Sequence, residues 1–204
     1  MVRPFFLRWR KNQSFLFFWS FMVLTYLYFN GFCCIIQDIE SFSQDKYCII
    51  HIVGERTMLF TLEKKQNAYE ARRGRNLGPT PHLHTHIEIV LIKEGTTVVA
   101  ADDIECVANT GDLFIAFPNQ IHYYLDKTER VHHEILIVSP DICPEFSQIF
   151  KTMIPRSPVL VGASENARIT QAIGNVIDVH KEDAVFADTE VRGYLLALFS
   201  ELFR

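Results

Sequence analysis

Three imidazoles and one carboxylate stand at alternate positions in one short run of the chain, at His82, His84, His86 and Glu88. Successive side chains of a regular strand point to opposite faces, so all four would face the same side. A further imidazole, His122, follows a later apolar run. Imidazole nitrogens with a carboxylate oxygen form a ligand set suited to zinc, iron, nickel or manganese. Inside a barrel, the same cluster could instead hydrogen-bond a hydroxyl group of a ligand.

Short runs rich in β-branched and aromatic residues surround these histidines. The predicted strands cover residues 58–62, 87–92, 96–101, 104–107, 113–117, 121–125 and 132–138. Glycine, proline, asparagine and aspartate stand between the runs, as hairpin turns require. Short strands at such close spacing predict an antiparallel sandwich or barrel and not a βαβ fold. The fold class is therefore expected to be mainly β.

The hydrophobic period changes after Pro140, from the alternation of strands to the spacing of helices. We expect a short helix over 144–154, a second helix that opens at Ser164, and a third from about Asp183 to the end. The third helix carries an apolar stripe that consists of Val191, Leu195, Leu198 and Leu202, widened by Tyr194 and Phe199. This stripe suits either core packing against the barrel or a helix-to-helix contact in a dimer.

The composition narrows the class of protein. The 204 residues are 49% apolar and 22% charged, with a formal net charge of −4, which excludes a disordered, collagen-like or disulfide-stapled chain. The length suits one globular domain with an appendage. Because Lys and Arg form no block, we expect no direct contact with nucleic acid. The five cysteines form no CxxC pair, which fits a reducing compartment and a cytoplasmic location.

Residues 1–57 form a hydrophobic extension that contains both tryptophans, Trp9 and Trp19. Residues 14–36 carry no formal charge, and a span of about 20 apolar residues matches the thickness of a bilayer. The segment is a candidate membrane anchor, with its cationic flank in the cytoplasm. It also fits a cleaved signal peptide, a hydrophobic core element, or a translated non-coding stretch upstream of a natural start at Met58. The sequence leaves these interpretations open.

Two residue spacings carry a resemblance to a known family. They are His82-x-His84-x3-Glu88-x6-Gly95 and Gly111-x6-Pro118-x3-His122. The first is the complete first cupin motif, and the second resembles the shorter second motif of AraC-type transcription regulators. The resemblance covers residues 58–204. It implies a cupin-like antiparallel barrel or jelly roll over 58–140 that binds an effector, and a helical dimerisation segment over 141–204.

The resemblance also implies what this chain would bind. The positions that match His82, His84, Glu88 and His122 hold a metal ion in cupin enzymes. In the AraC-like branch, the barrel usually senses a sugar or related metabolite without a metal. We therefore expect a homodimeric effector-binding module that catalyses no reaction, with the DNA-binding domain of such a regulator beyond residue 204. The alternative is a small metal-dependent cupin enzyme, an isomerase or dioxygenase, that uses a divalent metal at these residues.

Aromatic side chains near the motifs are candidates for the wall of a binding site. Phe114, Phe117, Tyr123 and Tyr124 lie in predicted strands, and about half of them must belong to the core because neighbours alternate faces. We select Phe117 and Tyr124 as candidate ligand-binding residues. His86 occupies a variable position of the motif and is expected on the rim or exposed.

The arginine-rich run 70–75 lies just upstream of the first motif. In a protein of the resembled family, this arm would cross the mouth of the pocket. Arg73 could then clamp a carboxylate or phosphate of the effector. The other interpretation is a solvated loop. His132 and His133 are neighbours in a late strand, so at most one of them faces the pocket.

A chain that begins at Met58 is expected to fold like the full chain, because the truncation would remove no core residue if residues 1–57 are not a natural part of the protein. Thermal unfolding followed by circular dichroism, with both chains side by side, checks this. Loss of the cooperative transition on truncation would contradict it.

Overall fold

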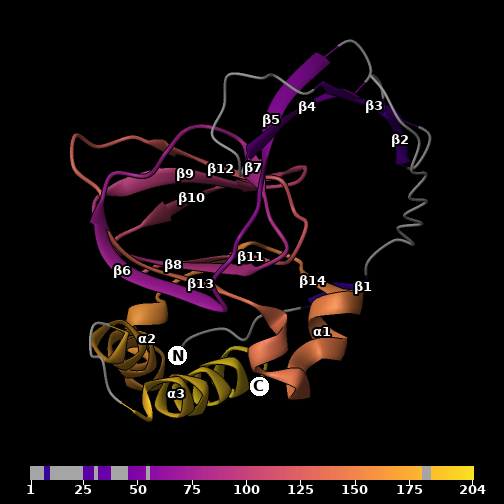
Figure 1. Cartoon of the computed structure of the whole chain (residues 1–204). Helices are drawn as coiled ribbons and strands as arrows, with labels where there is room; N and C mark the ends of the chain where they lie inside the picture. Colours follow the sequence, from indigo (N-terminus) through magenta and orange to yellow (C-terminus); the bar gives the residue numbers. More distant parts are fainter. Residues whose placement is uncertain (1–6, 10–24, 30–31, 38–45, 54–55, 181–184) are drawn as a thin grey trace.

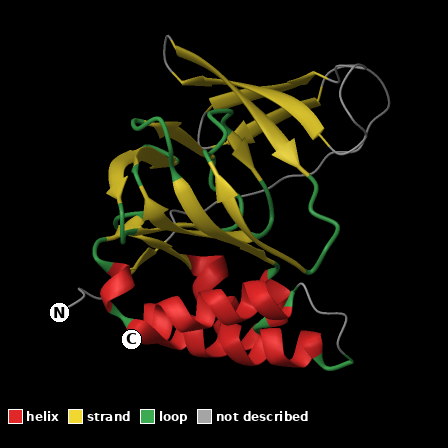
Figure 2. Ribbon diagram, turned by 90° about the vertical axis from the view of Figure 1, so that its left-hand side faces the viewer, coloured by secondary structure: helices red, strands yellow, loops and turns green. Residues whose placement is uncertain are grey.

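Two facing β-sheets and a layer of helices against one of them make up the chain in this computed structural model (Figures 1 and 2). The structure describes residues 7–9, 25–29, 32–37, 46–53, 56–180 and 185–204, with side chains from residue 60 onward. The predicted mainly β fold is confirmed. The sheets face each other as in a jelly roll and do not close into a barrel.

The first sheet has five strands and carries the helices on its outer side (Figure 1). Its order is β15 (Val159–Leu160), β11 (Leu113–Ala116), β8 (Ile87–Glu94), β13 (His132–Val138) and β6 (Tyr69–Arg75). All of its strand pairs are antiparallel. The strand β6 therefore lies at one edge of this sheet.

The second sheet has eight strands. Its order is β10 (Ile104–Asn109), β9 (Thr96–Ala101), β12 (His122–Asp126), β7 (His82–Leu83), β5 (Arg56–Glu63), β4 (Lys46–Val53), β3 (Phe32–Gln37) and β2 (Thr25–Phe29). The pair β5 and β7 is parallel. A separate short pair joins β1 (Leu7–Trp9) to β14 (Met153–Pro155).

Three helices lie in the described part of the chain after Pro140, as predicted, with β14 and β15 between the first and the second. They are α1 (Ser147–Thr152), α2 (Ala167–Val179) and α3 (Ala187–Leu202), with 3-10 turns at Pro140–Ile142, Pro144–Phe146 and Ala163–Glu165. The second helix begins later than expected, because Ser164 lies in a 3-10 turn. Asn166 caps α2 instead, and its side-chain oxygen accepts a hydrogen bond from the backbone N–H of Arg168 at 3.0 Å.

The five-stranded sheet separates two apolar cores. Its inner face contributes Val90, Ile92, Phe114, Ile135 and Ile137, which pack against residues of β9 and β12. Its outer face packs against the helices, and that core contains Ile89, Leu91, Ile115, Leu136 and Val138. Because these positions alternate strictly, β8, β11 and β13 each contribute side chains to both cores.

The apolar stripe of α3 belongs to the outer core and is not a dimer surface. Val191, Leu195, Leu198 and Leu202 are buried within the single chain, and so is Phe199. They pack against the outer face of the five-stranded sheet and against α2. The wide apolar stripe, which suggested a helix-to-helix dimer contact, is therefore buried inside one protomer.

The arginine-rich run 70–75 is a strand and not a loop. It forms β6, which pairs with β13 from Tyr69 opposite Val138 to Arg75 opposite His132. Because each residue of β6 has a fixed partner on β13, the face to which each arginine belongs is also fixed.

Parts of the hydrophobic extension are strands. Of the candidate membrane segment 14–36, residues 14–24 and 30–31 lie outside the described residues, and β2 pairs antiparallel with β3. Met58 lies within β5, which pairs with β4. No helix in the described part of the chain combines the length and the apolar character that crossing a bilayer requires.

Shortening Leu198 is expected to destabilise the monomer. Leu198 is fully buried in the outer core, so Leu198→Ala should lower the free energy of unfolding by about 2–5 kcal/mol through lost burial and a residual cavity. Chemical denaturation measures this loss. Leu196→Ala is the matched control, since Leu196 is only partly buried and should cost clearly less. Equal losses, or dissociation of a dimer without destabilisation, would contradict the assignment.

Candidate functional site

Four side chains from both sheets meet between them. His82 and His122 lie opposite each other on β7 and β12 of the eight-stranded sheet, and His84 follows β7 directly. Glu88 projects from β8 of the five-stranded sheet, and it is buried together with His84 and His122. The sequence prediction that these four residues converge is thus confirmed, while their role in binding stays a prediction.

The four residues form a compact cluster, which we call the His/Glu cluster. His84 Nε2 lies 3.1 Å and His122 Nε2 lies 3.6 Å from Glu88 Oε2. The rings of His82 and His122 have centroids 4.2 Å apart. One potential ligand atom from each of the four residues lies within 4.8 Å of the others.

Backbone carbonyls fix the orientation of all three imidazoles. In each ring, Nδ1 lies at hydrogen-bond distance from a carbonyl oxygen, which only accepts, so Nδ1 must carry the hydrogen. The contacts are His82 Nδ1 to Thr80 O at 3.0 Å, His84 Nδ1 to His86 O at 3.1 Å, and His122 Nδ1 to Gln120 O at 2.9 Å. In a neutral ring, the lone pair therefore resides on Nε2. For His84 and His122, this is the nitrogen that faces Glu88.

The Glu88 carboxylate is the only described acidic group of the cluster, and its two oxygens have different partners. The Tyr124 hydroxyl donates a hydrogen bond to Oε1, whereas Oε2 faces His84 and His122. Burial raises the pKa of Glu88, but the charge of His122 and the contacts with His122 and His84 outweigh burial and hold this pKa well below its usual range. Glu88 is therefore an anion between the sheets.

The surrounding groups respond to this anion. Burial lowers the pKa of His122, but the Glu88 carboxylate more than compensates and raises it above the ordinary value. Burial and Glu88 together raise the pKa of Tyr124 well above its ordinary value. Burial and the charge of His122 lower the pKa of His82. Glu88 thus favours a proton on His122, whose charge in turn opposes one on His82. His122 Nε2 is buried without a hydrogen-bond partner in the described part of the chain.

The two predicted aromatic residues lie on different faces. Tyr124 belongs to the inner core and contacts Glu88, while its predicted role in ligand binding stays a prediction. Phe117 is a correction, because it belongs to the outer core, with ring centroids 5.6 Å from Phe150 and 5.9 Å from Phe203. The phenylalanine beside the cluster is Phe114, whose ring lies 5.3 Å from that of Tyr124. Phe114 lies within β11, whereas Phe117 follows the end of this strand and belongs to the other core.

Arg73 is a second correction. Its guanidinium points to the outer side of the five-stranded sheet, where Nε lies 3.0 Å from Glu134 Oε1 and Nη1 lies 2.7 Å from Asp178 Oδ1 of α2. The hydrogen bond to Asp178 makes the largest contribution to the raised pKa of Arg73. Arg73 therefore ties β6 and β13 to the helical layer and does not line the space between the sheets.

A comparison with protein families decides the class of this chain. The family model described as AraC-like ligand binding domain matches residues 68–199, which is more than half of the sequence. The chain belongs to the AraC-like ligand-binding domains. Comparison with curated protein sequences gives no match.

Three solved structures are similar to this AraC-like domain. ToxT from Vibrio cholerae has 9% identity over 67% of this chain and 56% of ToxT, with a TM-score of 0.44. The AraC-like transcriptional activator CuxR has 12% identity over 84% of this chain and 57% of CuxR, with a TM-score of 0.40. A cupin-2 domain containing protein from Shewanella frigidimarina has 21% identity over 36% of this chain and 72% of that protein, with a TM-score of 0.31. The chain thus spans a little more than half the length of the two regulators.

Three further polar residues of the AraC-like domain were not selected from the sequence as pocket residues. His86 is buried and not on an exposed rim, and its Nε2 lies 2.9 Å from the carbonyl oxygen of Asn67. His133 is buried on the inner face of β13, and Arg72 precedes the outward-facing Arg73 on β6. Side chains alternate between the two faces of β6 and β13, so the pairing register of these strands would have identified Arg72 and His133 as inward-facing.

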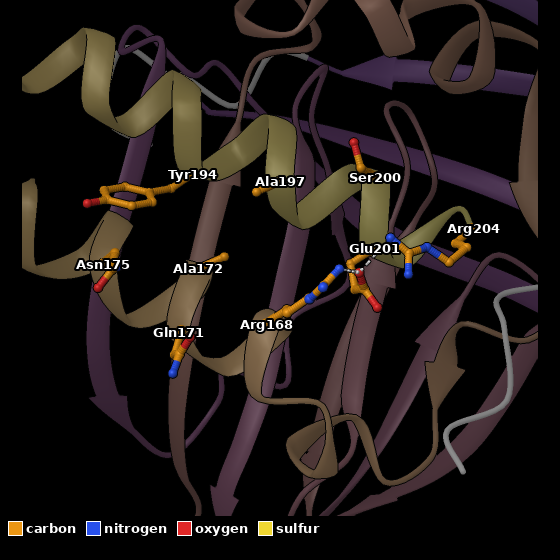
Figure 3. A pocket seen from close by; sticks show the side chains of 9 residues that line it. All are labelled: Arg168, Gln171, Ala172, Asn175, Tyr194, Ala197, Ser200, Glu201 and Arg204. Atoms are coloured by element: carbon orange, nitrogen blue, oxygen red, sulfur yellow. Dashed lines mark ion pairs between the residues drawn. The ribbon is translucent and has the colours of Figure 1, made fainter.

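A surface pocket of about 400 Å³ lies between α2 and α3, on the helical side of the AraC-like domain (Figure 3). Its charged residues already pair with one another. Glu201 Oε2 lies 3.5 Å from Arg168 Nη1 and 3.3 Å from Arg204 Nη2, and Asn166 donates a hydrogen bond to Glu201 Oε1 at 2.9 Å. We therefore place the candidate site at the His/Glu cluster and not here.

Removing the Tyr124 hydroxyl is expected to destabilise the AraC-like domain. Tyr124→Phe leaves one oxygen of the buried Glu88 carboxylate without its donor, which should lower the free energy of unfolding by about 1–3 kcal/mol. Tyr123→Phe is the matched control, because the Tyr123 hydroxyl donates to Glu105 at an exposed position. Urea denaturation of both variants measures the difference. Equal small losses would show that the Tyr124 contact contributes nothing.

Proposed function

We propose that this chain is the effector-sensing module of a cytoplasmic AraC-type transcription regulator. The effector is a small metabolite such as a sugar, and the His/Glu cluster receives one of its hydroxyl groups. The family to which residues 68–199 belong supports the ligand-binding role. The module binds and releases its effector without turnover.

One observation carries this proposal, namely that the cluster gathers polar atoms at one buried point and leaves one of them without a partner among the described residues. Nε2 of His84, Nε2 of His122 and Oε2 of Glu88 lie close together in a buried place. His122 Nε2 is buried without a hydrogen-bond partner among the described residues, and Glu88 Oε2 can accept a further hydrogen bond. A sugar hydroxyl both donates and accepts, so it can satisfy these two atoms together. The inner apolar side chains, Phe114 and Ile135 among them, offer a surface for the carbon skeleton.

We retain the homodimer as part of the proposal, on the strength of the family resemblance. The contact must use a surface other than the apolar stripe of α3, because that stripe is buried within the protomer. Within the helical layer, the exposed sides of α2 and α3 are the surfaces that a dimer contact could still use.

Thermal unfolding of the intact chain with neutral pentoses and hexoses tests the sensing function. Arabinose, xylose, galactose and glucose are the probes, at millimolar concentrations. A sugar at 100 times its Kd should stabilise the fold by about 2.7 kcal/mol. The stabilisation should disappear in Glu88→Gln and persist in Glu105→Gln, whose carboxylate is exposed on β10. Stabilisation by none of the sugars, or stabilisation that survives in Glu88→Gln, would refute the assignment.

The second candidate ligand of the cluster is a divalent metal ion. In that case the chain would be a metal-dependent cupin enzyme. The compactness of the cluster favours it, since the four potential ligand atoms lie within 4.8 Å of one another. Ligand atoms bonded at about 2.1 Å to one ion lie at most about 4.2 Å apart, so only a small contraction is required. The hydrogen bonds that fix each Nδ1 are the outer contacts that metal-binding histidines use.

Metal analysis distinguishes the two candidates. Untagged protein is titrated with Zn²⁺, Ni²⁺ and Mn²⁺, and the bound metal is measured after dialysis. One ion per chain that is lost in His122→Gln and retained in His132→Gln would favour the metal, because His132 lies outside the cluster beside Glu94. Sugar-dependent stabilisation in metal-free protein would favour the sensor.

A further inference from the structure

The inner face of the five-stranded sheet carries a second polar group of residues, at the edge formed by β6. In the register of β6 and β13, Arg72 lies opposite Ile135 and Gly74 lies opposite His133. Ile135 belongs to the inner core. Residues directly opposite in an antiparallel pair point to the same face, and diagonal neighbours lie within reach of long side chains. Arg72 and His133 are therefore diagonal neighbours on the inner face.

The position of Arg73 independently confirms the direction of Arg72. Arg73 contacts Glu134 and Asp178 on the outer side, so the adjacent Arg72 must face inward. The Arg72 side chain is 56% exposed, and its guanidinium lies 3.8 Å from Glu70 Oε2. This separation is that of an ion pair without a direct hydrogen bond, which an incoming anion would have to displace or share. Solvent and solutes therefore reach a cation that stands at the open edge between the sheets.

His133 is buried beside this cation. It is only 4% exposed, and its Nδ1 is buried without a hydrogen-bond partner among the described residues. A side chain at position 74 would collide with the ring, because a Cβ added to Gly74 would lie 2.5 Å from His133 Nε2. Because glycine has no side chain, position 74 leaves room for the imidazole ring of His133.

The charge of Arg72 acts on both neighbouring groups. Burial lowers the pKa of His133 and the charge of Arg72 lowers it further, while a backbone contact with Val131 opposes both. The same charge opposes the upward shift of the pKa of Tyr124, which contacts Glu88. The guanidinium is therefore electrostatically close both to His133 and to the edge of the His/Glu cluster.

We propose that Arg72 and His133 form an anion subsite that binds a carboxylate or phosphate group of the effector. Arginine offers a planar fork of donors that matches either group, and a neutral histidine can add one N–H donor. The inference rests on the proposed function and deepens it. An effector that also places a hydroxyl in the His/Glu cluster is then a hydroxylated acid or a phosphorylated sugar, which should bind more tightly than the neutral sugar of the same skeleton.

The smallest fragments of such an effector test the subsite directly. Acetate and inorganic phosphate are titrated separately into the isotopically labelled intact chain, with acetamide as the neutral counterpart of acetate. The Arg72 Nε–H and His133 ring resonances are followed by NMR. We expect saturable shifts of both residues at millimolar concentrations of one or both anions, and no shift with acetamide. The two anions distinguish a carboxylate from a phosphate as the preferred group.

Variants connect the shifts to the subsite. Arg72→Gln should weaken anion binding about tenfold, as expected for loss of a charge-assisted hydrogen bond, and His133→Phe should weaken it while keeping a ring in place. Arg75→Gln is the matched control, because Arg75 shares the outer face with Arg73, and it should leave binding unchanged. Equal shifts at Arg72, Arg73 and Arg75, or binding that survives in Arg72→Gln, would mean an adventitious ion only and would overturn the subsite.

The two proposals can fail separately. Neutral sugars that bind through Glu88, together with no anion binding at Arg72, would refute the subsite and support the sensing function. The opposite result would be anion binding that depends on Arg72, together with stabilisation by neutral and acidic sugars that is the same in Glu88→Gln as in the unchanged chain. That result would refute the sensing role of the His/Glu cluster and support the subsite.

Discussion

A carboxylate buried between two sheets is the constraint on which the rest of the site depends. An isolated buried anion would cost several kcal/mol, so Glu88 must receive hydrogen bonds or positive charge from its neighbours. Tyr124 on β12, His84 after β7 and His122 at the start of β12 meet this need. All three belong to the eight-stranded sheet or its connections, whereas Glu88 belongs to the five-stranded sheet. The polar contacts therefore connect the two sheets at the place where a guest would bind.

Strand alternation then assigns opposite roles to neighbouring residues. Arg72 and Arg73 differ by one position, yet one faces the space between the sheets and the other is bonded to α2. Phe114 and Phe117 are three positions apart and belong to different cores. A shift of one residue in the pairing of β6 with β13 would exchange the two arginines. The pairing register is thus as important for the chemistry as the residue types.

Much of this arrangement could be predicted from the sequence. The seven predicted strands all exist, because β-branched runs between turn residues are a strong local signal, and the motif spacing places the four members of the His/Glu cluster correctly. The strand β6 could not be predicted, since its charges and Gly74 are unfavourable for an isolated strand. Pairing with β13 along its whole length overrides that preference. The choice of Arg73 and Phe117 failed for the same reason, because each choice required a register that only tertiary pairing determines.

The orientation of the imidazoles explains why one residue set suits both a sensor and a metalloenzyme. Each Nδ1 is held by a backbone carbonyl, so each ring offers Nε2 whether the guest is a hydroxyl or a metal ion. The difference lies in Glu88, whose Oε1 accepts from Tyr124 and whose Oε2 faces the histidines. A hydroxyl requires only Oε2 and leaves the Tyr124 contact intact. An ion must draw four ligand atoms closer than the present 4.8 Å, and the Tyr124 hydroxyl, which holds the carboxylate from its other side, resists that contraction.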